Sequence, residues 1–360
     1  MNENIELLSS QLDHIDHELL VLLGERARIA ASIGKARKDQ GLPEHDPAGE
    51  KRKLGELTGG NPGPIESAKL ERLFQYIFEM SQEHKPNREQ RKLLVSRKAK
   101  SGDTVIHLKN AVIGGGAHVL VAGPCSVESR EQLRAVAAAM KQAGLNVLRG
   151  GAFKPRTSPY DFQGLGLEGL KIMKEVADEF DMVTISEIMN ASQLEYAANY
   201  IDVFQIGARN MQNFDLLKAA GQTKMPVLLK RGISATLDEF VNAAEYIMAG
   251  GNDRVMLIER GIRTYEKWTR NTLDISAVPL LKQETHLPVL VDVSHSTGRK
   301  DILLPCAKAA LAAGADGIMV ETHPDPPSAL SDSAQQIDLG QFRDFWNGLL
   351  DSGLYLGHKP

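Results

Sequence analysis

The sequence predicts an α/β fold: a (β/α)8 TIM barrel preceded by a small all-α domain. After Asp103, short strands rich in Val, Ile and Leu alternate with helices of about ten to fifteen residues, an order typical of a parallel sheet built from βα units. Eight such units fit between residues 103 and 358, which matches the size of a closed barrel. Before Asp103 the apolar residues recur at helical spacing instead.

Residues 1–86 are expected to form the helical domain. Apolar residues recur three and four positions apart from Ile5 to Ile33, which indicates one long helix with an apolar stripe. The members of this apolar stripe are Leu8, Leu12, Ile15, Leu19, Leu22, Ile29 and Ile33. So short a domain cannot cover the whole stripe, and we predict that a second copy of the chain covers it.

Two shorter helices are expected to follow. Asp46 before Pro47 is a typical helix start, and Pro64 with Glu66 is expected to open a third helix that reaches about Glu83. The connector HKPNREQRKLLVSRKAKSGD is rich in Lys and Arg. We therefore expect a solvated linker at residues 87–102 and the barrel domain at residues 103–360.

Two arginines fall on the face of the long helix that is otherwise apolar. Arg26 stands where the stripe should continue, and Arg37 lies about three turns further along the same face. Buried guanidinium groups are costly unless an anion accompanies them. The two arginines predict an anion-binding site; the alternative is that their side chains extend to solvent or pair with a carboxylate.

The barrel elements can be assigned in order. The expected strands are HVLVAGPCS, NVLRGGAF, MVTISEI, VFQIGA, PVLLKRG, RVMLIERG, PVLVDVSHS and DGIMVETH. The helices after them are expected near residues 129–143, 166–180, 191–199, 213–221, 236–250, 274–284, 299–313 and 335–350. A hairpin around TVIHLKNAVIGGG is expected to cap the barrel bottom, and its three glycines favour a tight turn over a phosphate cradle.

Composition narrows the class of function. The formal net charge is −4, and we see no local basic patch of the kind that binds nucleic acid or an anionic membrane. No apolar run of about 18 residues and no signal-like N-terminus is present, so we expect a cytoplasmic protein. The two cysteines cannot form a secreted-type disulfide framework; Cys306 lies in an apolar helix and is expected in the core.

Polar residues follow the predicted strands at the ends where barrel active sites form. They are Cys125, Arg149, Lys154, Arg156, Glu187, Arg209, Lys230, Arg231, Arg260, His295 and Glu321. Cations outnumber carboxylates in this set, and the guanidinium fork suits phosphate and carboxylate groups. Any one of them alone could instead form a salt bridge that stabilises a loop. Together they predict a mouth that binds at least two phosphate-bearing small molecules.

A metal site is predicted within the same mouth. Cys125, His295 and Glu321 end strands one, seven and eight, which are neighbours in a closed barrel, and Asp332 lies in the next loop. Sulfur, nitrogen and oxygen ligands together suit a divalent transition metal better than magnesium or calcium. Manganese, iron, cobalt, zinc and copper all fit this set. His323 is the alternative ligand, or a partner of a ligand.

The motifs in the barrel resemble those of 3-deoxy-D-arabino-heptulosonate 7-phosphate (DAHP) synthases of the type I-beta subfamily. They are GPCSVES, LRGGAFKPRTSPYDFQGLG, QIGARNMQNF, LLKRG, IERGIRTYE, DVSHSTGR, VETHPDP and LSDSAQQ. Residues 3–85 resemble the AroQ-type chorismate mutase that some of these synthases carry as an N-terminal fusion. The resemblance implies the first step of the shikimate pathway: phosphoenolpyruvate and erythrose 4-phosphate condense, water adds and phosphate leaves.

The resemblance also implies roles for single residues. Cys125, His295, Glu321 and Asp332 would bind the metal, which would act as Lewis acid and template. The implied substrate-binding residues are Arg149, Lys154, Pro155, Arg156, Thr157, Glu187, Arg209, Lys230 and Arg260. Within that set, the phosphate of phosphoenolpyruvate would contact Arg209, Lys230 and Arg260, its carboxylate Arg149 and Lys154, and erythrose 4-phosphate residues 154–157.

Lys154, Arg149 and Arg156 are the expected catalytic residues. Lys154 is the expected proton donor to the alkoxide, and a metal-bound water is the alternative. The sister reaction with arabinose 5-phosphate, catalysed by 3-deoxy-D-manno-octulosonate 8-phosphate synthase, is the nearest alternative function. The loop KPRTSPY argues against it, because the octulosonate enzymes resemble KANRSS there. A catalytically silent ligand-binding barrel would require a missing ligand or a missing Lys154.

The resemblance places a mutase-like pocket at Arg26, Arg37, Asp46 and Glu50. Ser9 and Gly49 stand where the mutases carry arginines, and Lys85 stands where they carry an ether-facing Gln or Glu. Two charge-assisted hydrogen bonds, each worth about 1.5–3 kcal/mol, are thereby lost, which predicts weak or absent mutase activity.

Three other functions of the helical domain stay open. Lys51 or Arg52 could supply a cation, so a fully bifunctional enzyme is one alternative. A feedback sensor of chorismate or prephenate is the second, and a dimerisation element is the third. The resemblance suggests a homo-oligomer, with a dimer through the helical domain and a tetramer through the barrels.

Overall fold

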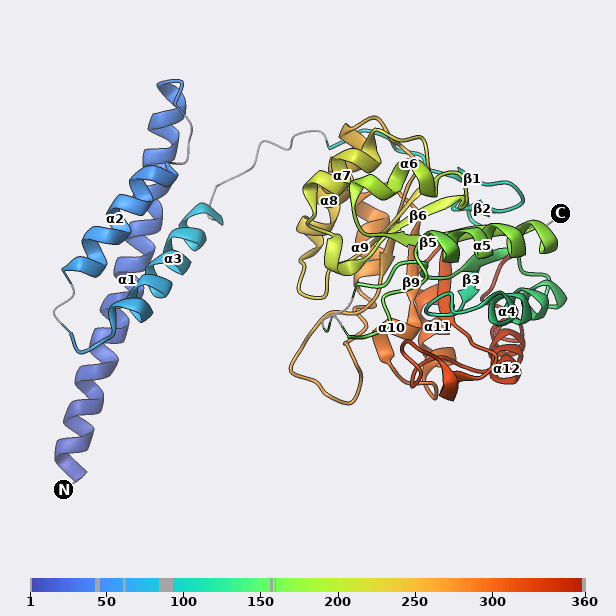
Figure 1. The fold of residues 1–360 in the computed structure, drawn as a ribbon. Coiled ribbons are helices and arrows are strands. Elements are labelled where there is room, and N and C mark those ends of the chain that lie inside the picture. The colour runs from blue at the N-terminus through green and yellow to red at the C-terminus, as the bar shows by residue number, and fades with distance from the viewer. Residues whose placement is uncertain are drawn as a thin grey trace. The chain divides into compact units, whose positions relative to one another are not determined.

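The computed structural model describes residues 2–42, 46–60, 63–83, 93–155, 158 and 160–357. The chain divides into two compact units, Met1–Arg91 and Lys92–Pro360 (Figure 1). Within the part of the chain that is described, no helix is long and apolar enough to cross a membrane.

The first unit is all-helical. It contains α1 (Asn2–Asp39), α2 (Pro47–Gly59) and α3 (Ser67–Glu83), and α3 packs against both of the others. Asp46 caps α2 by accepting a hydrogen bond from the backbone N–H of Gly49 at 2.9 Å. The third helix begins three residues later than Pro64, the predicted start: Gly63 lies in a turn with φ +73°, and the carbonyl of Glu66 accepts the first helical hydrogen bonds.

The apolar stripe of α1 is exposed within this unit. Its seven side chains, from Leu8 to Ile33, each keep between 51 and 59 % of their surface accessible. Apolar side chains in such a row gain free energy when they leave water. That a second copy of the chain covers them stays a prediction.

The second unit is a closed barrel of eight parallel strands in which β10 pairs with β3. The strands are β3 (Val119–Gly123), β4 (Val147–Arg149), β5 (Val183–Ile188), β6 (Val203–Ile206), β7 (Val227–Lys230), β8 (Val255–Glu259), β9 (Val289–Asp292) and β10 (Gly317–Glu321). The helices are α4 (Arg130–Gln142), α5 (Leu167–Phe180), α6 (Leu194–Ala197), α7 (Phe214–Gly221), α8 (Leu237–Ala249), α9 (Ala277–Glu284), α10 (Val293–Thr297), α11 (Leu303–Ala312) and α12 (Leu339–Leu350), with 3-10 turns at Ala191–Gln193, Ala208–Asn210 and Pro326–Ser328. The predicted fold class is confirmed.

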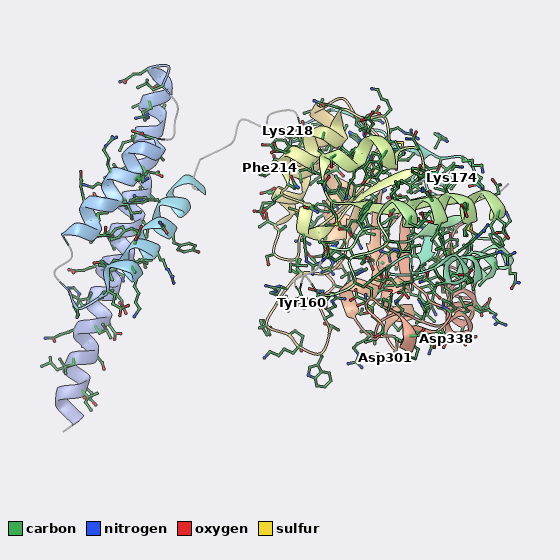
Figure 2. The ribbon with its side chains drawn as sticks, in the orientation of Figure 1. Tyr160, Lys174, Phe214, Lys218, Asp301 and Asp338 are labelled. Atoms are coloured by element: carbon green, nitrogen blue, oxygen red, sulfur yellow. The ribbon has the colours of Figure 1, made fainter. Side chains whose placement is uncertain are left out.

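The outer helices turn one face to the barrel and the other to water. Lys174 of α5 and Lys218 of α7 project from the surface (Figure 2), with exposed fractions of 46 and 59 %. Leu170 and Met173 of α5 point inward and are fully buried. This alternation follows the helical repeat that predicted the elements from the sequence.

A short hairpin closes the bottom of the barrel. β1 (Ile106–His107) pairs antiparallel with β2 (Val112–Ile113), and Ile106 and Ile113 join the apolar cluster inside the barrel. Glycines 114–116 all have positive φ, between 74° and 90°. Only glycine adopts such a run at low cost, so the segment is the tight turn that the sequence predicted.

Part of the predicted linker belongs to the barrel. Val95 is fully buried, and the backbone N–H groups of Leu94 and Val95 each donate to the carboxylate of Glu245 in α8 at 3.0 Å. Ser96 forms a β-bridge with Thr285. A solvated linker was expected here, but Val95 lies in the core and Leu93 packs against it, whereas Leu94 and residues 98–102 are exposed.

Candidate active site

The predicted site residues converge at the carboxyl ends of the strands. Arg149, Lys230 and Glu321 are the last residues of β4, β7 and β10, and Cys125 lies two residues beyond β3. Parallel strands in a closed barrel all end at the same rim, which is why residues so far apart in the sequence meet here.

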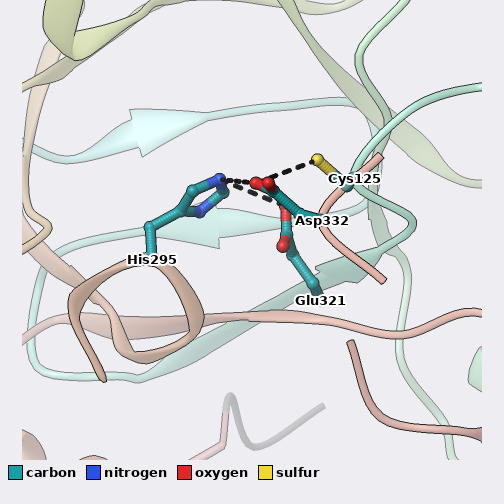
Figure 3. A group of neighbouring side chains, drawn as sticks. All are labelled: Cys125, His295, Glu321 and Asp332. Carbon is teal, nitrogen blue, oxygen red and sulfur yellow. Dashed lines mark hydrogen bonds and ion pairs between the residues drawn. The ribbon is translucent and has the colours of Figure 1, made fainter. Parts of the chain in front are cut away.

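Four groups with metal-ligand chemistry face one another (Figure 3). Their nearest donor atoms, from Cys125, His295, Glu321 and Asp332, all lie within 4.8 Å of one another. The Nε2 atom of His295 lies 3.3 Å from Oε1 of Glu321 and 3.6 Å from Oδ2 of Asp332. The sulfur of Cys125 lies 3.6 Å from the same Asp332 oxygen.

Asp292 sets the orientation of His295. As the last residue of β9 it caps α10, accepting the backbone N–H of His295 at 2.9 Å, and its other oxygen lies 2.7 Å from Nδ1 of the ring. Lys230 contacts the same oxygen at 2.6 Å. A carboxylate only accepts, so Nδ1 carries the proton and the lone pair of Nε2 faces Glu321 and Asp332. Burial lowers the pKa of His295, although Asp292 and Glu321 oppose the shift, and this favours the neutral ring.

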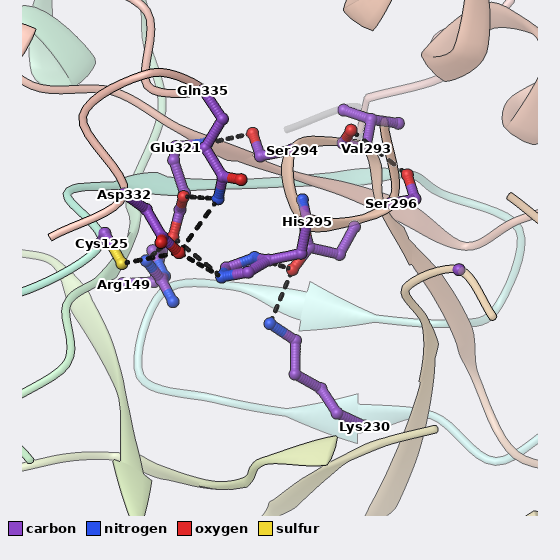
Figure 4. A network of polar contacts seen from close by, with 12 residues as sticks. Cys125, Arg149, Lys230, Val293, Ser294, His295, Ser296, Glu321, Asp332 and Gln335 are labelled. Carbon is purple, nitrogen blue, oxygen red and sulfur yellow. Dashed lines mark hydrogen bonds and ion pairs between the residues drawn. The ribbon is translucent and has the colours of Figure 1, made fainter. Parts of the chain in front are cut away.

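Glu321 is fully buried, and each of its carboxylate oxygens accepts a hydrogen bond. Arg149 donates to Oε1 at 2.7 Å, and Gln335 donates to Oε2 at 2.6 Å (Figure 4). Burial would raise the pKa of Glu321, but His295 and Arg149 hold it below its usual value. The pKa of Asp332 is lowered as well: burial opposes the shift, and His295 and Arg270 outweigh it. Both carboxylates are therefore anionic.

Lys154 lies against the cysteine. Its Nζ is 3.1 Å from the sulfur of Cys125 and 3.1 Å from the carbonyl oxygen of the same residue. Burial, reinforced by Glu321, raises the pKa of the Cys125 thiol to about 11. Burial would lower the pKa of Lys154, but the facing Cys125 raises it, followed by Glu187 and Glu321. Lys154 is thus a buried, charged donor beside several anionic groups.

Comparison with known proteins now identifies the family. The model of the DAHP synthetase I family matches residues 95–352. The chain belongs to the DAHP synthetase I family. The model of chorismate mutase type II matches residues 8–85, so an N-terminal domain of that kind precedes the synthase domain.

Individual relatives of this DAHP synthetase domain agree. Phospho-2-dehydro-3-deoxyheptonate aldolase of Thermotoga maritima is 54 % identical over 251 residues, covering 70 % of this chain and 74 % of that protein. A crystal structure of a DAHP synthase from the same organism matches with a TM-score of 0.71 at 51 % identity, covering 73 % of this chain and 78 % of that one. A 2-dehydro-3-deoxyphosphooctonate aldolase of Koribacter versatilis is more distant, 33 % identical over 264 residues, covering 68 % of this chain and 94 % of that protein.

The excess of positive charge at the barrel mouth of the DAHP synthetase domain is smaller than the sequence predicted. The guanidinium of Arg231 lies 2.9 Å from Glu259 and 2.8 Å from Asp274, and Lys230 pairs with Asp292. The sequence count omitted these carboxylates, although Glu259 and Asp292 are the last residues of β8 and β9; Asp274 lies in the loop after β8. Arg231 therefore has a structural partner and is not a free ligand-binding group.

Two arginines of the mouth form no ion pair with any residue that the structure describes. Arg260 is only 6 % exposed, and burial lowers its pKa. Arg209 lies in the exposed turn Ala208–Asn210, close enough for its charge to act on Arg260. Two like charges held together favour a bound anion between them.

Two of the remaining predicted positions, Glu187 and Pro155, lie in the described part of the chain. Glu187 in β5 accepts from Gln205 at 3.4 Å, and its carboxylate fills the space that a side chain at residue 207 would need, which explains Gly207. Pro155 follows Lys154 and is half-buried. Arg156 and Thr157 lie outside the described residues.

The sequence also predicted the roles of one histidine, His323, and one cysteine, Cys306. His323 does not join the four ligand-type groups: its Nε2 lies 3.4 Å from Glu128, and its Nδ1 accepts the N–H of Asp325. The two-residue alternation that placed it beside Glu321 does not apply, because β10 ends at Glu321. Cys306 packs half-buried against the outer core, as the sequence predicted.

Sequence reasoning missed several residues that contact the ligand-type groups. They are Asp292, Arg270, Ser331 and Gln335. Asp292 carried a usable signal, since it stands three residues before His295 in DVSHS, the spacing of a helix cap. Ser331 and Gln335 lie in the motif LSDSAQQ beside Asp332, but nothing in the sequence alone links Arg270 to Asp332.

In the helical unit, both predicted pocket arginines have protein partners. The guanidinium of Arg26 lies 4.6 Å from the ring centroid of Phe78. Arg37 forms an ion pair with Asp46 at 3.3 Å. Glu50 is half-buried in the first turn of α2. Lys85 lies outside the described residues.

Proposed function

We propose that the barrel condenses phosphoenolpyruvate with erythrose 4-phosphate to DAHP and inorganic phosphate. The observation that carries this proposal is the set of four ligand-type groups within 4.8 Å, with buried Arg149, Lys154, Lys230 and Arg260 around it. A mouth with both features suits two phosphorylated substrates and a carbonyl that must be activated. The relatives named DAHP synthase support the same reaction.

The donor set fits a divalent transition metal. Neutral His295 and anionic Glu321 and Asp332 offer lone pairs toward one another, an arrangement that a cation between them would stabilise. The raised pKa of Cys125 stems partly from these carboxylates, so a cation would favour the thiolate. The metal would be manganese, iron, cobalt, zinc or copper, and when bound it supplies a Lewis acid for the aldehyde.

Substrate binding is assigned to the cations. Arg209, Lys230 and Arg260 hold the phosphate of phosphoenolpyruvate, and Arg149 with Lys154 holds its carboxylate. The contacts of Arg149, Lys154, Lys230 and Arg260 are strong because these four side chains are buried, and a charge-assisted hydrogen bond gains more where water is excluded. Residues 154–157 hold erythrose 4-phosphate, and Glu187 orients the groups beside it.

Bond formation follows from this arrangement. Carbon 3 of phosphoenolpyruvate attacks the aldehyde carbon, and the resulting alkoxide takes a proton from Lys154, the charged donor beside Cys125. Positive charge then develops at carbon 2, where water adds, and the carbon–oxygen bond to phosphate breaks. The buried carboxylates of the site, Asp292 and Glu321, stabilise that developing positive charge.

The experiment compares two aldehyde substrates in separate assays. Purified full-length protein is incubated with phosphoenolpyruvate and either erythrose 4-phosphate or arabinose 5-phosphate, and released phosphate is measured. We expect phosphate release with erythrose 4-phosphate and none with arabinose 5-phosphate. Preference for arabinose 5-phosphate would show an octulosonate synthase, and no release with either aldehyde would favour a silent ligand-binding barrel.

For the helical domain we propose weak or absent mutase activity. Arg37 is already paired with Asp46, and residue 49 offers no guanidinium. A Cβ at residue 49 would lie 2.6 Å from Oδ2 of Asp46, so Gly49 lets Asp46 fold over the start of α2. A sensor of chorismate or prephenate is the second candidate, because Arg26 and Arg37 could still attract a dianion.

Chorismate consumption, followed optically, tests this proposal. Little turnover by the wild type is expected, with a gain in Gly49→Arg if Asp46 moves aside; robust wild-type turnover would contradict the proposal and favour a bifunctional enzyme. Adding prephenate to the synthase assay separates the remaining functions. Inhibition without turnover indicates a sensor, and no effect indicates a dimerisation element.

A further inference from the structure

The loop between β8 and α9 folds back on itself beside the metal-type ligands. Ile262 and Thr272 exchange two backbone hydrogen bonds at 2.9 Å, and their neighbours form a narrow arm that we call the brace, residues 261–273. The tip of the brace is in water, with Trp268 81 % exposed. Its base follows Arg260, so one segment runs from the proposed phosphate site to the ligand cluster.

The inner strand of the brace is fixed to the helix that carries His295. The backbone N–H groups of Arg270 and Asn271 donate to the carbonyls of Thr297 and Ser296, each at 2.9 Å. The side-chain amide of Asn271 donates to the carbonyl of His295 at 3.0 Å. The backbone of Arg270 is therefore held in register with His295, whatever its side chain contacts.

The side chain of Arg270 reaches the opposite ligand. One nitrogen, Nη1, donates to Oδ2 of Asp332 at 3.1 Å and to Oε1 of Gln335 at 2.7 Å. Asp332 has φ +50°, a left-handed conformation that is unfavourable for a residue with a side chain. Gln335 in turn donates to both Glu321 and Asp332. Arg270 thus joins two loops that carry ligand-type groups.

We propose that Arg270 is a positioning residue that holds Asp332 in ligand geometry against His295 and so increases the affinity of the site for a divalent metal. This inference rests on the proposed metal site. Arg270 contacts no reacting atom and is not itself a metal ligand; it acts through Asp332 and Gln335.

A purely electrostatic role would have the opposite effect. A fixed positive charge next to Asp332 repels a metal ion, so its removal would strengthen metal binding. Geometric support predicts weaker binding on removal, because Asp332 would leave the left-handed conformation. Loss of outer contacts of this kind typically lowers metal affinity about 10- to 100-fold. The sign of the change therefore separates the two roles.

The experiment measures the affinity for Co²⁺ in full-length, metal-stripped protein by competition with a chelator of known affinity, together with the visible absorption of bound cobalt. Arg270→Gln removes the charge and the fork, whereas Arg270→Lys keeps the charge. Lys267→Gln removes one positive charge from the exposed tip of the same brace and is the matched control. Circular dichroism in chelator confirms folding, and Arg270→Lys carries the test where Arg270→Gln does not fold.

The expected result is about 10- to 100-fold weaker Co²⁺ binding in both Arg270 variants, with altered cobalt absorption, and unchanged binding in Lys267→Gln. Unchanged binding in Arg270→Lys, or tighter binding in Arg270→Gln, would overturn the inference. Cys125→Ser distinguishes failure of the site itself. If Cys125→Ser binds Co²⁺ as tightly as the wild type does, the proposed metal site is wrong and the inference falls with it. If Cys125→Ser binds Co²⁺ weakly while both Arg270 variants bind it as the wild type does, only the inference is wrong.

Discussion

Asp292 is the position where a single conservative change should have the largest effect on the barrel. It is fully buried, contacts Lys230 at 2.6 Å and the ring of His295 at 2.7 Å, and accepts a backbone N–H at 2.9 Å. In Asp292→Asn only one of the two hydrogen bonds from His295 can persist, because the amide has one acceptor oxygen, and Lys230 loses its counter-ion. Removing one partner of a buried ion pair costs about 3–5 kcal/mol of unfolding free energy.

The pH dependence gives this prediction a second signature. Burial already lowers the pKa of Lys230, although Asp292 opposes the shift, so the variant should lower that pKa further. Between this folded-state pKa and the unfolded value of about 10.4, the unfolded chain binds more protons than the folded one. Stability therefore rises with pH in that window. The deficit of Asp292→Asn should be smaller at pH 9 than at pH 7.

The assay is denaturant unfolding of the chelator-treated protein, followed by fluorescence at both pH values. Asp301→Asn is the control, because Asp301 pairs with Arg299 at the surface with 60 % of its side chain exposed, and such pairs are worth about 1 kcal/mol or less. An Asp292→Asn protein as stable as the control at pH 7 would refute the reasoning, as would a deficit that grows with pH.

Three further outcomes are expected. Lys154→Gln should lower kcat about 10²- to 10⁴-fold without loss of Co²⁺ binding, and near-wild-type kcat would exclude Lys154 as proton donor. Glu245→Gln removes the charge that accepts two backbone N–H groups, so limited proteolysis within residues 93–100 should accelerate; equal cleavage rates would contradict the anchoring role. Tyr355→Phe removes a hydrogen bond to the carbonyl of His118 and should cost about 1 kcal/mol by thermal unfolding, whereas an unchanged midpoint would show that the bond contributes nothing.

Much of the fold was predictable because one physical rule governs each part. All eight strands formed where buried apolar runs alternate with helical segments. The ligand-type group was predictable for a similar reason: once a barrel is assumed, Cys125, His295 and Glu321 must end at one rim. The barrel rule needs no knowledge of side-chain contacts.

The rest depended on contacts that no local pattern encodes. Arg270 meets Asp332 across 62 positions, and Val95 meets Glu245 across 150. Counting charges along the sequence assigned Arg231 to ligand binding, because its ion-pair partner Asp274 lies 43 positions away in the chain. The third helix began late because a positive φ at Gly63 places a turn before it. Tertiary partners decided each of these features.

The measurement that most directly tests the central claim is the rate of condensation of phosphoenolpyruvate with erythrose 4-phosphate by full-length protein before and after complete removal of divalent metal. Elemental analysis of the same sample establishes that metal is absent, and Cys125→Ser is assayed in parallel. We predict that activity is lost on removal and returns with Mn²⁺ or Co²⁺ in the wild type, at much higher metal concentration in Cys125→Ser. A rate that is unaffected by verified removal of metal would contradict the account.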